Sequence, residues 1–338
     1  MSIKDVAQAA GVSITTVSHT LSGARAVAPA TRDQVMAAVE RLGYRPDPFA
    51  RGLRGRRSYV LGMVGDRVIT TPHTSTMVLG AQSAAAARGS FVAAVDSGGS
   101  AAVEAQQIRG LTDHRVDGLI YARMHHQSVV LPASVGRTPV VLLDASSSEG
   151  LAVSSIVPHE VGISETAVRH LVAHGHRRIG FMTTSGAAPA IAGREAGFRR
   201  AMAGAGLDVD DSLVQRADHA TAARGRALGR LLLERPDPPT AVLCFNDQLA
   251  MGLYQAAARA GAAIPRDLSV VGVDNLPLVA EALDPGLTTV AVPHFAMGQW
   301  AVNRLLDLIE DPGSTPCEQV ELACPLVERG SMGPPPPR

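Results

Sequence analysis

The chain begins with the segment IKDVAQAAGVSITTVSHTL, residues 3–21, in which two helical patterns flank a glycine. Apolar residues at helical spacing predict a first helix over residues 3–10. Gly11 ends this helix, because glycine adopts a left-handed backbone without strain. Ser13 then caps a second helix, predicted over residues 14–21. Two helices joined by so tight a turn are typical of a helix-turn-helix, whose second helix enters the DNA major groove.

A third helix is predicted over residues 31–42, where Gly43 stops it. Two prolines, Pro46 and Pro48, separate it from a basic segment, residues 49–57, that is long enough for only a short helix. Its two glycines weaken such a helix by ~1 kcal/mol each, and a helix this short is marginal in water. The spacing alone leaves two interpretations open: a hinge that folds only when it is held, or a solvated basic linker.

The charge of the chain is divided unevenly, although the 338 residues are neutral overall. Residues 1–60 hold nine basic and four acidic side chains, a net charge of +5, which leaves −5 for the rest of the chain. A basic module attached to an acidic body is typical of a protein that binds nucleic acid through one end.

Length and composition bound the class of protein. A chain of 338 residues with 46% hydrophobic residues fits a small module and a two-lobed body, whose core must be aliphatic because only 3% of residues are aromatic. No apolar run is long enough to span a membrane, and no apolar signal region begins the sequence. We therefore expect a cytoplasmic protein without a membrane partner.

Cysteine and histidine give no sign of a metal site. The three cysteines, Cys244, Cys317 and Cys324, form no Cys-x-x-Cys pair and are predicted to be reduced thiols. The histidines at residues 125–126 and 174–176 have no further ligands at metal-binding spacing, so we expect them in loops or on the surface. We predict no metal ion and no cofactor.

From Val60 onward, short apolar runs alternate with amphipathic helical segments. This alternation predicts a parallel sheet covered by helices on both faces. The pattern restarts at residue 160, which indicates two α/β lobes in tandem. No dinucleotide fingerprint, phosphate-binding loop or nucleophile elbow follows any strand, so the sequence indicates no enzyme.

Polar side chains follow several predicted strands, where open parallel sheets bind their ligands. Asp144, Asn246 and Asp274 each come at the end of an apolar strand, and Arg194 begins a helix after another. Carboxylate, amide and guanidinium groups that converge on one cleft suit vicinal hydroxyl groups. Asp247 is predicted to cap the next helix, and a simple turn residue is the alternative interpretation of Asp274.

Several short motifs occur together in register and resemble the LacI/GalR family of transcriptional regulators. They are Asp5-Val6-Ala7, Ala10-Gly11-Val12-Ser13, Thr16-Val17-Ser18, Gly43-Tyr44 and Arg115-Val116-Asp117-Gly118-Leu119-Ile120. The resemblance covers nearly the whole chain. It implies an all-α helix-turn-helix module followed by an α/β body like periplasmic binding proteins, with two doubly wound parallel-sheet lobes.

The resemblance also implies an order of domains. We expect a DNA-binding module at residues 1–45, a hinge helix at residues 46–58, and a two-lobed effector-binding and dimerisation domain at residues 59–330. In that domain the chain is expected to cross between the lobes near residues 159, 290 and 322. The proline-rich end, residues 331–338, is predicted to be disordered from its composition.

The family assigns DNA contacts to particular positions. Ile14, Thr15 and His19 occupy the base-reading positions, while Thr16 and Ser18 are expected to contact phosphates or to cap. Leu53 matches the leucine that wedges between base pairs, which would kink the duplex. Arg54 is the expected minor-groove or phosphate contact.

Family ligand contacts fall on the same four residues that the strand ends select, Asp144, Arg194, Asn246 and Asp274. His219 and His294 lie at or near two further contact positions. His219 replaces an aromatic platform that is usual in sugar sites, which weakens the assignment of a sugar.

Together these features predict a DNA-binding transcriptional regulator, a repressor that binds a palindromic operator in double-stranded DNA as a homodimer. A small-molecule effector, most simply a carbohydrate, would control it through the cleft. The alternatives are an effector that is a nucleoside, nucleobase or other metabolite, a solute-binding protein without a DNA function, and an enzyme on the same scaffold.

Overall fold

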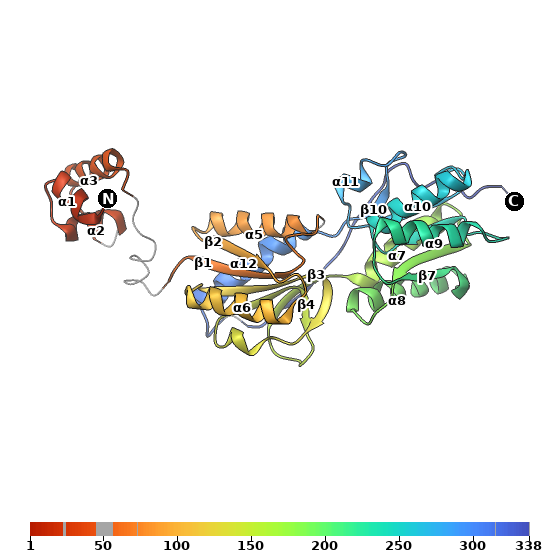
Figure 1. Ribbon diagram of the computed structural model, residues 1–338, viewed down its shortest axis with the longest axis horizontal. Coiled ribbons are helices and arrows are strands. Elements are labelled where there is room, and N and C mark those ends of the chain that lie inside the picture. The colour runs from red at the N-terminus through yellow and green to blue at the C-terminus, as the bar shows by residue number, and fades with distance from the viewer. Residues whose placement is uncertain (23–24, 45–56, 73, 315, 338) are drawn as a thin grey trace. The chain divides into compact units, whose positions relative to one another are not determined.

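The structure, a computed structural model, describes residues 1–338 except 23–24, 45–56, 73, 315 and 338 (Figure 1). The chain divides into two compact units, Met1–Tyr59 and Val60–Arg338. Most of the predicted hinge helix, including Leu53 and Arg54, lies outside the described residues.

The N-terminal unit contains three helices, α1 (Ile3–Ala9), α2 (Ile14–Ser22) and α3 (Pro29–Leu42). Their contact surfaces bury a small core that all three helices share: Val6, Ala7, Val17, Val35 and Ala38. The predicted helix-turn-helix and third helix are confirmed, with ends that differ by one or two residues.

Local capping sets the helix ends of this unit. The Ser2 backbone N–H donates to the Asp5 carboxylate over 2.7 Å, which closes the start of α1. The Ser13 hydroxyl accepts from the Thr16 N–H over 3.0 Å at the start of α2. Gly43 ends α3 in the left-handed region with φ 58°. The predicted cap at Ser13 and the predicted helix end at Gly43 are confirmed.

The first lobe of the body is built on a six-stranded sheet in the order β11-β5-β4-β3-β1-β2, with all pairs parallel. Its strands are β1 (Val60–Asp66), β2 (Phe91–Asp96), β3 (Gly118–Val129), β4 (Val140–Ser147), β5 (Ser154–Pro158) and β11 (Gln319–Leu322). Its helices are α5 (Ser75–Ala87), α6 (Ala101–Asp113), α12 (His294–Glu310) and the short 3-10 helix η1 (Ala133–Val135). Helices α5 and α12 pack together on one face of the sheet, and α6 lies on the other (Figure 1).

The second lobe repeats this plan with the order β12-β10-β9-β8-β6-β7, in which only β12 runs antiparallel to its neighbour. Its strands are β6 (Ile179–Thr184), β7 (Val214–Ala217), β8 (Ala241–Cys244), β9 (Ser269–Val273), β10 (Thr288–Val290) and β12 (Leu326–Val327). Its helices are α7 (Glu160–Ala173), α8 (Pro189–Gly204), α9 (Ala222–Leu233), α10 (Asp247–Ala260), α11 (Pro277–Ala280) and the 3-10 helix η2 (Asp211–Leu213). The predicted pair of parallel-sheet lobes is confirmed.

The chain crosses between the two lobes three times. It leaves the first sheet after β5, returns to the first lobe between β10 and α12, and crosses again between β11 and β12. These positions agree with the expected crossings near residues 159, 290 and 322. Three segments of the chain therefore connect the two lobes.

Glycine permits close packing of the helices that cover the first sheet. A Cβ atom on Gly80 of α5 would lie 2.0 Å from the Phe295 carbonyl oxygen, and one on Gly298 of α12 would lie 2.0 Å from the Met77 carbonyl oxygen. Any larger residue at either position would push the two helices apart. The same helix, α12, begins with His294 at the cleft, so this packing fixes one wall of the site.

The predicted disorder of residues 331–338 is wrong for most of that segment. Ser331 is fully buried, and its hydroxyl donates to the Val270 carbonyl over 2.6 Å and accepts from the Thr288 N–H over 2.8 Å. Pro335 packs against Gly175. The composition of this segment predicts disorder. In the structure it forms hydrogen bonds with residues of β9 and β10, and these bonds stabilise it despite its low intrinsic propensity for structure.

His176 is buried as well, with only 1% of its surface exposed, so its predicted surface position is wrong. Its Nε2–H donates to the Gly333 carbonyl over 2.9 Å, and its Nδ1 lies 2.9 Å from the Thr240 hydroxyl. Burial lowers the pKa of this imidazole. His176 therefore acts as a buried tie between the second lobe and the C-terminal segment.

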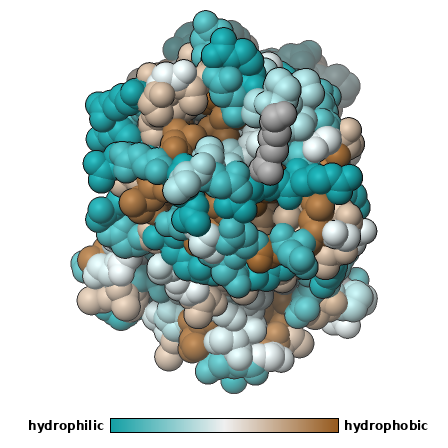
Figure 2. Space-filling model, turned by 90° about the vertical axis from the view of Figure 1, so that its right-hand side faces the viewer, coloured by the Kyte–Doolittle hydropathy of each residue, from teal (hydrophilic) through white to brown (hydrophobic). Residues whose placement is uncertain are grey.

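The end of the body that carries the C-terminus shows mainly hydrophilic residues interspersed with small apolar patches (Figure 2). Within the described parts of the chain, no helix combines the length and apolar character that crossing a bilayer requires.

Candidate functional site

A cleft of about 600 Å³ lies between the two lobes, at the carboxyl ends of their parallel strands. Open parallel sheets place their ligands at this edge. All six side chains predicted to bind the ligand line this cleft: Asp144, Arg194, His219, Asn246, Asp274 and His294. The structure therefore brings these six side chains to one cleft, as the sequence predicts.

Two of the acidic side chains stand on unusual backbone. Asp144 lies in β4 with φ 55°, and Asp274 follows β9 with φ 105°. Residues other than glycine seldom adopt positive φ, and such strain collects at functional sites, where the surrounding fold must hold it in place. The turn interpretation of Asp274 and its place in the cleft are thus compatible, because the turn aims the carboxylate inward.

Arg194 forms the buried centre of the cleft floor, with 4% of its surface exposed. Its Nε donates to a Glu160 carboxylate oxygen over 2.7 Å, and its guanidinium stacks 4.3 Å over the Phe245 ring. Its Nη1 also donates to the Phe245 carbonyl. Glu160 begins α7, so this ion pair joins two helices at the site.

Close packing of α7 and α8 makes that ion pair possible. A Cβ atom on Gly197 would lie 2.1 Å from the Val161 carbonyl oxygen, and one on Gly193 would lie 2.6 Å from the Glu160 Cβ. Glycine at both positions allows α8 to approach the start of α7. Arg194, between these glycines, is thereby brought against Glu160.

The carboxylates of the cleft have strongly perturbed acidity. Burial raises the pKa of Asp144 well above its usual value, the neighbouring Glu160 raises it further, and Arg194 opposes the shift. Burial likewise raises the pKa of Asp274 to about 7, while Arg194 counteracts this. The Asp144 Oδ1 atom is buried without a hydrogen-bond partner. A ligand that supplies donors or positive charge would satisfy these groups.

Asn246 has a structural role in addition to its place in the cleft. It caps α10, because its side-chain oxygen accepts from the Leu249 N–H over 2.9 Å, and its amide donates to the Ala220 carbonyl over 3.2 Å. The predicted cap was Asp247, and that prediction is wrong by one residue. The reason is that β8 ends at Cys244, so the extended position before the helix falls on Asn246.

Asp247 instead lies fully buried behind the cleft. Its carboxylate accepts from the Leu276 N–H over 2.7 Å and from the Thr289 hydroxyl over 2.6 Å. Burial raises its pKa to about 8. Because these bonds tie down the loop that follows β9, Asp247 positions Asp274.

The two predicted histidines differ in burial. His294 has 6% of its surface exposed at the start of α12. His219 lies in the loop before α9, where its backbone N–H donates to the Asp218 carboxylate over 2.9 Å. Both side chains line the cleft, as the sequence predicts.

The first lobe supplies a wall that the sequence did not reveal: Arg67, Thr70, Thr71, Pro72, Met124 and His125. These residues come from the loop after β1 and from β3, and no periodicity or motif marks them. His126 beside them has its pKa lowered to about 4, mainly by burial. Only the fold brings this wall opposite Arg194.

The second helix of the N-terminal unit presents a polar face away from its core. Val17 is fully buried, while Ile14 and Thr15 are exposed and Ser18 and His19 are partly exposed. Thr16 lies 2.8 Å from the Ser13 hydroxyl at the helix start. A helix with this division can place the predicted base-reading side chains in a major groove.

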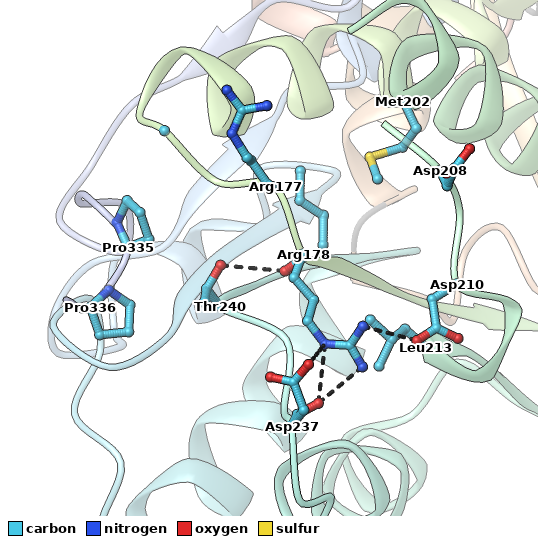
Figure 3. A pocket seen from close by; sticks show the side chains of 12 residues that line it. Arg177, Arg178, Met202, Asp208, Asp210, Leu213, Asp237, Thr240, Pro335 and Pro336 are labelled. Carbon is cyan, nitrogen blue, oxygen red and sulfur yellow. Dashed lines mark hydrogen bonds and ion pairs between the residues drawn. The ribbon is translucent and has the colours of Figure 1, made fainter. Parts of the chain in front are cut away.

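A second hollow, of about 440 Å³, lies at the amino ends of the strands in the second lobe (Figure 3). Its central guanidinium, Arg178, is already paired: Nη1 lies 3.0 Å from an Asp210 carboxylate oxygen, and Nε lies 3.1 Å from an Asp237 oxygen. Pro335 and Pro336 close one side. Arg177 and Asp208 also line this hollow but are exposed to solvent, so its described lining holds no buried charged group without a partner, unlike the cleft between the lobes.

The described residues contain no group of three histidine, cysteine or acidic side chains arranged to hold a metal ion. Cys244, Cys317 and Cys324 are free thiols, of which Cys317 alone is exposed.

Comparison with known proteins gives two family matches. Residues 2–47 match the bacterial regulatory proteins of the lacI family, and residues 168–332 match the periplasmic binding protein-like domain. The first match covers the helix-turn-helix, and the second covers most of the lobe that carries Arg194, Asn246 and Asp274.

Full-length relatives show the same order of parts. The chain is 33% identical over 338 residues to the sucrose operon repressor of Escherichia coli, covering 98% of this chain and 99% of that one. It is 32% identical over 311 residues to the HTH-type transcriptional repressor PurR of Photobacterium profundum, covering 91% and 92%. Among solved structures, the lac repressor dimer bound to operator and the anti-inducer ONPF is 27% identical, with a TM-score of 0.84 and coverage of 98% and 99%.

Proposed function

The chain belongs to the lacI family of bacterial regulatory proteins, and from this premise we propose that a small polyhydroxylated effector in the cleft controls its affinity for operator DNA. As a member of this family it is a DNA-binding transcriptional regulator. We further propose that it is a repressor, that it acts in the cytoplasm, and that it binds a palindromic operator as a homodimer, since one module reads only a half-site.

The observation that carries the effector role is the convergence of six polar side chains on one cleft between two lobes. Asp144 comes from the first lobe, and Arg194, Asn246 and Asp274 come from the second. A ligand bound by both sides stabilises the arrangement in which both sides reach it. It therefore shifts the lobes toward that arrangement by its differential affinity for it.

Coupling to DNA follows if the two lobe arrangements present the linker differently. The linker would then fold, or fail to fold, against the operator, with Leu53 as a wedge between base pairs and Arg54 as a backbone or minor-groove contact. By linkage, operator binding changes effector affinity by the same factor as effector changes operator affinity.

Base recognition is assigned to α2. Ile14 offers an apolar contact such as one to a thymine methyl, whereas Thr15 and His19 offer hydrogen bonds to base edges. Thr16 and Ser18 are assigned to phosphate contacts, which fix the register without carrying sequence information.

A hydroxyl-rich effector is favoured over a flat nucleobase by the lining of the cleft. Among the described lining residues, Phe245 is the one phenyl, phenol or indole ring, and Arg194 already covers its face at 4.3 Å. A base is commonly held by stacking on such a ring, and Arg194 takes one of its two faces here. The first-lobe wall adds the hydroxyls of Thr70 and Thr71 and the guanidinium of Arg67, beside the apolar Pro72 and Met124. The relatives named above are repressors, which also favours regulation over solute transport or catalysis.

The proposal is tested with an operator selected from random duplex DNA by the full-length protein. Binding to it should weaken steeply as salt rises, because phosphate contacts release counterions. A sugar or polyol that raises the melting temperature of the protein should then change operator affinity, and Thr15→Ala should weaken operator binding without changing that melting shift. Affinity for DNA that ignores salt and sequence would remove the DNA-binding proposal. A bound sugar with no effect on operator affinity would remove the effector proposal alone.

A further inference from the structure

The floor of the cleft holds more negative than positive groups. Three carboxylates, Asp144, Glu160 and Asp274, interact electrostatically with the single guanidinium of Arg194. Asp144 and Glu160 have 2% and 6% of their surfaces exposed, and Arg194 has 4%. Buried charges in proteins are normally paired, because an isolated one loses its hydration without compensation.

Arg194 is committed to one of these carboxylates. Its Nε donates to Glu160 over 2.7 Å, and its Nη1 donates to the Phe245 carbonyl. Asp144 Oδ1 is buried, lines the cleft and accepts no hydrogen bond. The Asp274 carboxylate accepts no hydrogen bond from a described residue either. Two acidic groups that line the cleft are thus left without a hydrogen-bonded counter-charge.

Three further ionisable groups near the cleft, His126, Asp247 and Arg67, do not correct this imbalance. His126 on β3 has its pKa lowered to about 4, chiefly by burial and then by His125 and Arg194, so it is neutral near pH 7. Asp247 on α10 adds a further buried carboxyl group next to Asp274, whose charge raises the pKa of Asp247. Arg67, on the opposite wall, is exposed to solvent.

We propose that the effector carries a cationic amine beside its hydroxyl groups, as an amino sugar or another aminated polyol does, and that Asp144 and Asp274 bind this amine. The proposal rests on the effector role of the cleft and specifies its ligand. An ammonium group is a compact positive charge with three donors, so one such group can donate to two neighbouring carboxylates, one from each lobe. A neutral polyol supplies hydrogen-bond donors but no positive charge that would stabilise the ionised form of the two carboxyl groups.

Proton balance gives this binding mode its own signature. In the empty cleft the pKa of about 7 keeps part of the Asp274 carboxyl group protonated near pH 7, and burial raises the pKa of Asp144 as well. When an ammonium group enters, the carboxylate form is favoured and the displaced protons pass to the buffer, while the ligand keeps its own N–H protons. A neutral ligand releases no protons in this way.

The test uses matched sugars on the full-length protein. D-glucosamine, D-galactosamine and D-mannosamine are each compared with the parent hexose and with the N-acetyl derivative, which has the bulk at that position but no charge. Isothermal titration calorimetry at pH 7 in two buffers of different ionisation enthalpy gives affinity and proton release together. We expect at least one amine to bind about tenfold more tightly than its two neutral partners and to release protons. A tenfold difference in affinity corresponds to a shift of one unit in the pKa of a carboxyl group that binds the amine.

Variants assign the effect to the two carboxylates. Asp144→Asn and Asp274→Asn keep the shape of each side chain, and asparagine tolerates the positive φ at both positions, so the fold should persist. Each variant should bring the affinity ratio of amine to parent sugar close to one. Asp208→Asn removes the same charge from an exposed residue outside the cleft and should leave the ratio unchanged.

Parent or N-acetyl sugars that bind as tightly as the amines, or amines that show no binding, would overturn the proposal. So would an amine preference that survives both cleft variants. Operator binding measured in the same preparation distinguishes a failure of the amine proposal from a failure of the proposed effector role. A neutral sugar that binds and changes operator affinity would leave the proposed function standing without the amine, whereas bound sugars that never change operator affinity would remove the effector role itself.

Discussion

The helix-turn-helix unit and the cleft are assembled in different ways. The helices of the first unit are capped by contacts between residues three apart, as in the pairs Ser2–Asp5 and Ser13–Thr16. The cleft gathers side chains from residue 67 to residue 294, and Asp144 and Asp274 face it from different lobes. The first site depends mainly on local sequence, and the second depends on how two sheets and their connections are arranged.

Backbone strain differs in the same way. In the described part of the N-terminal unit up to residue 44, positive φ occurs only at glycines, Gly11 and Gly43, where it has little cost. In the cleft it occurs at Asp144 and Asp274, where the surrounding fold must hold it. The DNA-reading unit is thus built from unstrained local backbone. The ligand site keeps strained backbone at two carboxylates that have no hydrogen-bonded counter-charge among the described residues. Four substitutions or titrations test this contrast.

The largest effect is expected in the core of the small unit. Val35 is fully buried there, and Val35→Asn would place an unpaired amide in a core of only five residues. We expect a loss of about 3 kcal/mol or more, enough to unfold the unit. Operator binding should fall below detection, while the melting shift caused by an effector should persist.

Met36 offers a matched control on the same helix, because 47% of its surface is exposed. Met36→Asn should keep the helix content of the unit, measured by circular dichroism. Equal damage from both variants, or loss of effector binding in Val35→Asn, would show that the two units do not behave independently.

A smaller effect is expected behind the cleft. Asp247→Ala leaves the Leu276 N–H and the Thr289 hydroxyl without their acceptor, which costs about 2–3 kcal/mol for buried donors. Because the loop that carries Asp274 is then released, effector affinity should fall about tenfold although Asp247 does not line the cleft. Titration calorimetry measures the affinity, and Asp208→Ala is the exposed control. Unchanged affinity in Asp247→Ala would mean that Asp274 needs no such support.

The acidity of Asp274 predicts a dependence of stability on pH. Its pKa is raised from 3.8 to about 7 in the folded protein, so the folded state binds the proton more tightly than the unfolded state. This stabilisation is complete below pH 4 and is lost as pH rises through 7. Between pH 5 and pH 8 the free energy of unfolding should fall by on the order of 2 kcal/mol more in the wild type than in Asp274→Asn. Parallel melting curves for the two proteins would contradict the raised pKa.

The smallest effect is expected at the cap of the reading helix. Ser13→Ala removes the acceptor of the Thr16 N–H and should destabilise the N-terminal unit by about 1 kcal/mol. Operator affinity should weaken severalfold, as measured by fluorescence polarisation, and Ser13→Asn should restore it because asparagine also caps. A weak operator complex in both variants would instead point to a direct DNA contact by the serine hydroxyl.

Much of the site could be predicted from sequence because the rule for parallel sheets is topological. Polar residues at strand ends meet at one edge, and Asp144, Arg194, Asn246 and Asp274 were selected on that basis together with a family resemblance. Glu160 was not selected, since a glutamate at a helix start usually signals only a favourable interaction with the helix dipole. Its pairing with Arg194 depends on the close approach of α7 and α8 at Gly197, which no local pattern reveals.

Sequence by itself determined the three helices of the first unit and the two α/β lobes, because caps, turns and hydrophobic periodicity act over a few residues. Only the tertiary structure decided that residues 331–337 are held against the second sheet, that Asn246 rather than Asp247 caps α10, and that Arg194 leaves Asp144 unpaired. These outcomes depend on which buried polar groups find partners from distant segments. That is a property of the folded arrangement, in which burial makes each missing or completed hydrogen bond decisive.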